Sequence, residues 1–277
     1  MDYGISNNQG KTHPDEVKKI LNLASANSIG SIDTAMSYGN SEEVIGTVDN
    51  NNFKIITKLP EVPEQITDIP NWIESNLLKS LKKLRCSSID SLLLHYPDQL
   101  LEKKSDIIYK SLDSLKEKKL VKKIGISIYE PSQLDFIIPR FDFDIVQSPL
   151  NIADRRIINS GWSSKLRKRK IELHVRSIFL QGLMLVKKEE IEKKFKLWDV
   201  FWNNWYEWLN ETNITPLNAC LNFSLQHEDV SKVIIGTQNA NQLQEILNNI
   251  DNKFIRVPDW SKDVTDNLVN PSAWGSL

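Results

Sequence analysis

The chain has 277 residues, of which 40% are hydrophobic and 26% are charged, a composition typical of a globular protein rather than a disordered one. The formal net charge of -1 provides no basic field for nucleic acid, and the apolar runs are far shorter than the ~20 residues of a membrane-spanning helix. The two cysteines, Cys86 and Cys220, are isolated, and the first residues lack the apolar core of a signal peptide. We therefore expect a cytoplasmic protein without nucleic-acid or membrane partners.

Helix and strand patterns alternate from one end of the chain to the other. The first helix is expected at residues 14–27, where apolar residues recur on one face. Strands are expected at short apolar runs, at residues 31–35, 54–59, 89–95, 123–127, 144–148, 172–178 and 232–237. Further helices are expected from residue 41 and at residues 70–84, 105–118, 131–138, 160–169, 197–210, 216–226 and 239–249. This alternation is typical of a parallel α/β architecture.

The strand segments contain continuous rather than alternating apolar runs, which indicates burial on both faces and favours a closed (β/α)8 TIM barrel over an open sheet. No linker divides the chain, so we expect one domain over residues 1–277, with residues 251–277 as a C-terminal tail. A barrel of this kind has eight strands, whereas seven segments are readable. The first strand should precede residue 14, but residues 1–10 read as a loop, so we expect that strand to be missing from this chain.

Four polar residues lie at or just past the ends of three consecutive predicted strands: Asp33, Tyr38, Lys58 and His95. Strand ends meet at one mouth of a barrel, so these side chains should converge. An ammonium group beside a phenol lowers the phenol pKa from its ordinary value near ~10, which makes the tyrosine a usable proton donor. Asp33 would hold Lys58, and His95 would orient a carbonyl oxygen. Reduction also needs hydride, which no side chain supplies, so a nicotinamide cofactor is implied.

The motifs DTAxxYGxSExxIG, TK, LLLH and GIS occur in this order, and together they resemble the aldo-keto reductases. These are single (β/α)8-barrel oxidoreductases that use NADPH, and the resemblance extends from about residue 1 to residue 249. It implies that Tyr38 is the general acid, that Lys58 and Asp33 tune it, and that His95 orients the substrate carbonyl. It also implies NADP(H) or NAD(H) as cofactor and a small aldehyde or ketone as partner.

Through the same resemblance, Ser127 and Gln147 match residues that bind the nicotinamide carboxamide, although Ile128 replaces the usual asparagine. Arg176 stands where many members stack a tyrosine on the nicotinamide ring, and a planar guanidinium can also stack. The segment that resembles the pyrophosphate-binding loop contains Ser177, Phe179 and Gly182.

At the adenosine end, Gly236 and Gln242 replace a lysine and an arginine that often contact the 2'-phosphate, while Thr237 and Glu245 keep the expected type. Arginine and lysine are the natural phosphate partners, so their loss weakens the case for strict NADP preference. No GxGxxG motif offers a separate dinucleotide site.

Two other functions remain open. A cofactor-binding regulatory or scaffold subunit with little catalysis is suggested by Ile128, Arg176 and the missing strand. A metal-dependent hydrolase would need clustered ligands, but the four histidines are dispersed and no metal site is expected. His174 is expected to be structural. A helical stripe of tryptophans is expected to pack against the barrel or, alternatively, to line the pocket: Trp198, Trp202, Trp205 and Trp208. The tail from Trp260 should fold over the mouth or remain loose.

Overall fold

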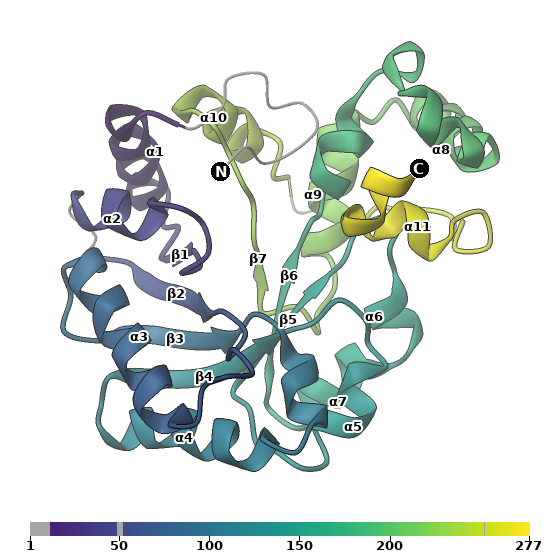
Figure 1. The fold of residues 1–277 in the computed structure, drawn as a ribbon. Coiled ribbons are helices and arrows are strands. Elements are labelled where there is room, and N and C mark those ends of the chain that lie inside the picture. The colour runs from purple at the N-terminus through teal and green to yellow at the C-terminus, as the bar shows by residue number, and fades with distance from the viewer. Residues whose placement is uncertain (1–11, 49–51, 252) are drawn as a thin grey trace.

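The computed structural model describes residues 12–48, 52–251 and 253–277. Its centre is one sheet of seven parallel strands, whose spatial order follows the order in the chain. The sheet curls as it proceeds from β2 to β7, and helices cover its outer side (Figure 1). The strands are β1 (Ser31–Asp33), β2 (Lys54–Leu59), β3 (Ile89–Leu94), β4 (Val121–Ser127), β5 (Ile145–Pro149), β6 (Glu172–Arg176) and β7 (Lys232–Val233).

All seven predicted strands are therefore present, in an α/β barrel architecture. β3 is buried along its whole length, as expected for a strand covered on both faces, although it contains Asp90 and Ser91 beside its apolar residues. β7 is much shorter than the predicted segment 232–237. The residue after its neighbour β6, Ser177, has a φ of 59° and turns the backbone away, so little of β6 remains to pair with β7.

The helices are α1 (Pro14–Ala26), α2 (Ser41–Gly46), α3 (Ile69–Leu84), α4 (Ser105–Glu117), α5 (Gln133–Ile137), α6 (Arg156–Asn159), α7 (Trp162–Lys168), α8 (Asp199–Thr212), α9 (Pro216–Leu225), α10 (Ala240–Asn248) and α11 (Asp266–Val269). Side-chain oxygens of Asp68, Thr215 and Asn239 accept backbone N–H groups at the starts of α3, α9 and α10. The helix predicted at residues 160–169 is present as α7, which begins after Gly161, whose φ is 74°, and the short helix α6 precedes it outside the predicted range. No described helix combines the length and apolar character needed to cross a membrane.

The tryptophan stripe is buried, as expected for packing. Trp202 and Trp205 are 1% and 0% exposed, and Trp205 stacks on Trp208 with ring centroids 5.8 Å apart. The C-terminal tail packs on the same region, because the Trp274 ring lies 4.8 Å from that of Phe195. The tail is therefore not loose over its described part.

The two outermost strands of the sheet are β1 and β7, and no described strand lies between them. Lys232 on β7 donates a hydrogen bond from Nζ to Ser31 Oγ on β1 at 2.8 Å, which links their amino ends. The helices next to these two strands in the chain, α1 before β1 and α10 after β7, also contact each other. Glu16 of α1 accepts a hydrogen bond from the Ala240 N–H of α10 at 2.9 Å. The first strand of the barrel, which we expect to be missing, would fall within or before residues 1–11, and these residues lie outside the described part of the chain.

Candidate active site

The four predicted catalytic residues come from three adjacent strands. Asp33 ends β1, Lys58 is the penultimate residue of β2, and His95 directly follows β3. Tyr38 lies in the turn between β1 and α2, where its N–H donates to Ala35 O at 3.0 Å. The parallel register of β1, β2 and β3 brings these strand ends side by side.

Lys58 and Asp33 form a buried ion pair. Lys58 Nζ lies 2.5 Å from Asp33 Oδ2 and also donates to Thr34 O at 2.9 Å, and its side chain is only 1% exposed. Burial lowers the pKa of Lys58, although the Asp33 carboxylate opposes this effect. The Lys58 ammonium lies 5.2 Å from the centroid of the Tyr38 ring, so a buried cation stands beside the phenol.

His95 completes the cluster from the third strand. Its ring lies edge-on to Tyr38 with centroids 5.7 Å apart, and its Nδ1 lies 3.2 Å from Ser37 Oγ. Burial, together with the nearby cations Lys58 and Arg176, lowers the pKa of His95 to about 4. The imidazole is therefore neutral at pH 7 and carries one N–H. When Ser37 donates to Nδ1, that N–H is on Nε2, where it can serve a ligand.

Ser127, the last residue of β4, and Gln147, the middle residue of β5, lie beside the predicted catalytic cluster. They are register partners, and Ser127 Oγ donates to Gln147 Oε1 at 3.5 Å. Gln147 Nε2 donates to Asp33 Oδ1 at 2.8 Å. Both side chains are buried, at 1% and 0% exposure. The two predicted carboxamide ligands are thus joined to the Asp33 carboxylate.

Arg176 ends β6 and faces the same region. Its guanidinium lies over the Tyr129 ring, with Cζ 4.8 Å from the centroid, and donates to Ile128 O at 3.0 Å. Within the described residues it forms no salt bridge, although Asp33 and Lys58 are paired with each other. The sequence gives no sign of Tyr129, because its contact with the Arg176 guanidinium forms only when the segment after β4 lies next to the end of β6 in the folded protein.

The loop after β6 has an unusual backbone. Ser177, Leu180, Gln181 and Gly182 have φ values of 59°, 46°, 56° and 91°, although only one of them is a glycine. Left-handed residues of this kind cluster at functional sites and can turn backbone N–H groups toward an anion. Asn151, which is 0% exposed, donates from Nδ2 to Ser177 O at 3.0 Å and fixes the start of the loop. No sequence motif indicated Asn151. Phe179 lies within this loop and is half-buried.

The segment after β7 is closed by contacts among its own residues. Thr237 Oγ1 donates to Asn239 O at 2.8 Å, and Gln242 Oε1 accepts the Gln238 N–H at 2.8 Å. Glu245 lies exposed on α10, and Gly236 is exposed just before Thr237. The predicted adenosine-end residues therefore lie near one another around the start of α10. Among the described residues, no hydrogen bond joins them to Asp33, Lys58 or His95.

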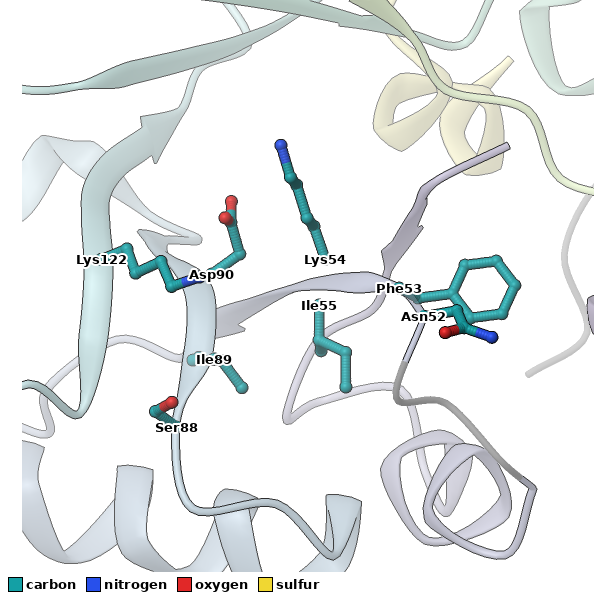
Figure 2. Close-up of a pocket in the computed structure, with 8 residues that line it drawn as sticks. All are labelled: Asn52, Phe53, Lys54, Ile55, Ser88, Ile89, Asp90 and Lys122. Carbon is teal, nitrogen blue, oxygen red and sulfur yellow. The ribbon is translucent and has the colours of Figure 1, made fainter. Parts of the chain in front are cut away.

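Two cavities lie away from the catalytic cluster. One, of about 220 Å³, is at the amino ends of β2, β3 and β4, where Lys54 and Asp90 extend from neighbouring strands (Figure 2). The other, of about 310 Å³, is lined by Leu101, Phe136 and Arg140 on the helical exterior. Among the described residues no group of three or more His, Cys, Asp or Glu side chains could hold a metal ion.

Comparison with known proteins identifies the class. Parallel strands in chain order and surrounding helices define an α/β barrel architecture, which this chain shares with solved structures. A model of the Aldo/keto reductase family matches residues 1–256, so the chain belongs to the aldo-keto reductase family, as its motifs predicted. Among curated proteins no match was found.

Solved structures share the fold at low sequence identity. An aldo-keto reductase from Bacillus halodurans, in its holo form, has a TM-score of 0.70 at 18% identity, with 91% of this chain and 87% of that chain covered. The glycerol dehydrogenase from Gluconobacter oxydans has a TM-score of 0.69 at 21% identity, with 93% of this chain and 87% of that chain covered. These similarities support the barrel fold.

Proposed function

We propose that this chain is an NAD(P)H-dependent carbonyl reductase that converts an aldehyde or ketone to an alcohol. The observation that carries the proposal is the buried Lys58 ammonium, which is paired with Asp33 and lies 5.2 Å from the centroid of the Tyr38 ring. A cation held beside a phenol favours the phenolate and therefore helps the phenol to release its proton.

Tyr38 donates its proton to the carbonyl oxygen as negative charge develops there. Lys58 stabilises the resulting phenolate, and Asp33 keeps Lys58 in place. His95, which is neutral at pH 7, donates one hydrogen bond to the same carbonyl oxygen and orients it. When bound, the nicotinamide cofactor supplies the hydride.

The residues present fit such a cofactor. Ser127 and Gln147 offer a hydroxyl and an amide that suit a carboxamide, and Gln147 would exchange its bond to Asp33 for this contact. The backbone of residues 177–182 suits a pyrophosphate, because its positive φ values favour an anion-binding turn. Gly236, Thr237, Gln242 and Glu245 would contact the adenosine end. Within this set no arginine or lysine is available for a 2'-phosphate, which favours NAD(H).

The test is the loss of nicotinamide absorbance when the protein is mixed with NADH or NADPH and a panel of aldehydes and ketones. Tyr38→Phe should reduce kcat at least a thousandfold, an effect on the order of those seen when catalytic groups are removed. Tyr109→Phe is the matched control, because Tyr109 lies on α4 and its hydroxyl donates to Asp142 O.

Turnover that survives Tyr38→Phe would contradict the proposed role of Tyr38. Tight cofactor binding without turnover of any carbonyl would instead favour a non-catalytic, cofactor-binding subunit. Ile128 and Arg176, which replace the usual asparagine and tyrosine and contact each other through Ile128 O, keep that second function open.

A further inference from the structure

The mouth of the barrel carries a cation that is not neutralised by a carboxylate. Lys58 is paired with Asp33, whereas Arg176 contacts the Tyr129 ring, Ile128 O and Ser177 Oγ but forms no salt bridge within the described residues. The Arg176 charge reaches the catalytic centre, because it contributes to the lowered pKa of both Lys58 and His95. With His95 neutral, Lys58, Asp33 and Arg176 leave one net positive charge.

Arg176 borders the space where a nicotinamide ring has to lie. The substrate carbonyl must reach Tyr38 and His95, so the ring must lie beside it and within reach of Gln147 on β5. In the register of β5 and β6, Gln147 pairs with His174 and Pro149 pairs with Arg176. Alternate residues of a strand point to the same face of the sheet, so Arg176 lies on the same face as His174 and Gln147. Arg176 is two residues closer than His174 to the carboxyl end of β6, where the mouth of the barrel lies.

The two forms of the cofactor differ in charge at this point. The reduced dihydronicotinamide ring is neutral, whereas the oxidised ring is a pyridinium cation that has lost two electrons and one proton as hydride. An aromatic side chain beside the ring would attract the pyridinium by a cation–π contact. A guanidinium in the same place repels it.

We infer that Arg176 makes this site bind the reduced nicotinamide cofactor more tightly than the oxidised form, and so favours carbonyl reduction and release of the oxidised cofactor. The inference rests on the function proposed above. Two unit charges near a protein surface and ~5 Å apart interact strongly enough to change a dissociation constant by about tenfold even after substantial screening by solvent.

The test measures dissociation constants of the full chain for NADH and NAD+, and for NADPH and NADP+, by isothermal titration calorimetry at low ionic strength. The variants are Arg176→Met, which removes the charge; Arg176→Gln, which also removes it but keeps a hydrogen-bond donor for Ile128 O; and Arg176→Lys, which keeps the charge. Arg167→Met is the matched control, because Arg167 lies on α7 and pairs with Glu228 on the surface.

We expect the ratio of oxidised to reduced dissociation constants to exceed one in the unmodified protein. This ratio should fall about tenfold in Arg176→Met and Arg176→Gln, and should keep the value of the unmodified protein in Arg176→Lys and Arg167→Met. Addition of salt should reduce the ratio in the unmodified protein. A ratio that does not change in the two neutral variants would overturn the inference but leave the reductase intact. Failure of the unmodified protein to bind any of the four cofactors would instead overturn the proposed function, and the inference with it.

Discussion

Gln147 donates a hydrogen bond from Nε2 to Asp33 Oδ1 at 2.8 Å, across 114 positions of sequence. The other oxygen of the same carboxylate, Oδ2, accepts from Lys58 Nζ at 2.5 Å. One carboxylate on β1 therefore joins the proposed cofactor ligand on β5 to the proposed catalytic lysine on β2. A cofactor that draws Gln147 away leaves Asp33 bonded to Lys58 alone, so cofactor binding and the electrostatics of the proton donor are coupled.

The Lys58–Asp33 pair should contribute strongly to stability. Asp33→Asn leaves the ammonium of Lys58, which is 1% exposed, without a carboxylate partner. Removal of one member of a buried ion pair typically costs ~3 kcal/mol or more, and we expect a loss of about that size in the free energy of unfolding at pH 7. Urea denaturation followed by circular dichroism measures it.

The matched control for this variant is Glu74→Gln. It breaks the 2.5 Å pair between Glu74 and Lys118, whose side chains are 33% and 48% exposed. An exposed pair of this kind contributes less than ~1 kcal/mol. Equal losses for the two variants would show that burial does not determine the contribution of the Lys58–Asp33 pair.

Glu16 should disfavour cofactors with a 2'-phosphate. Its carboxylate accepts the Ala240 N–H at the start of α10, and this bond lowers the pKa of Glu16. A negative charge at this helix start repels a phosphate that approaches the same N–H groups. Glu16→Gln keeps an acceptor for Ala240 and removes the charge, so the affinity for NADPH relative to NADH should rise roughly threefold to tenfold.

Fluorescence titration with NADH and NADPH measures this change. Asp15→Asn is the control, since Asp15 is on the same helix but pairs with His13. A similar change in both variants would indicate a general effect of net charge rather than the contact between Glu16 and Ala240.

The strands, and the convergence of polar residues at their ends, were predictable from sequence because their signals are local. Each strand is a short apolar run, and Asp33, Lys58 and His95 stand at strand ends that a parallel barrel must bring together. The start of α7 was also readable, since Gly161, near the beginning of the predicted helix at residues 160–169, is the residue that directly precedes the helix.

The remaining site residues depend on contacts between distant segments. Asn151 acts on the backbone of Ser177, and Glu16 acts on the backbone of Ala240, 224 positions away. An asparagine or a glutamate of this kind has no local pattern that distinguishes it from a surface residue. The length of β7 likewise depends on the backbone of Ser177, which follows the neighbouring strand β6, rather than on its own apolar run.

Gly46 marks a close approach of α2 to α3. A Cβ atom at Gly46 would lie 2.0 Å from the backbone oxygen of Lys83, which cannot move without displacing the end of α3. Alanine normally stabilises a helix relative to glycine by up to ~1 kcal/mol, but here Gly46→Ala should destabilise the protein by roughly 1–3 kcal/mol. Gly30→Ala is the control, because a Cβ there meets no atom within 4 Å. Thermal unfolding of both variants measures the difference, and similar melting temperatures would contradict this account of the contact.

His95 should titrate far below an ordinary histidine. Its pKa in the folded protein is about 4, compared with the ordinary value of 6.5, because of burial first and the charges of Lys58 and Arg176 second. Between these two pH values the unfolded chain binds the proton and the folded chain does not. The stability of the fold therefore rises with pH through this window and is lost as the pH falls through it.

Two-dimensional NMR of the His95 imidazole resonances should give a titration midpoint near 4. Arg176→Met removes one of the cations and should raise that midpoint, whereas Arg167→Met on the surface should not change it. A midpoint near 6.5 in the unmodified protein would show that His95 is protonated in weak acid and would remove the basis for its role as a neutral hydrogen-bond donor.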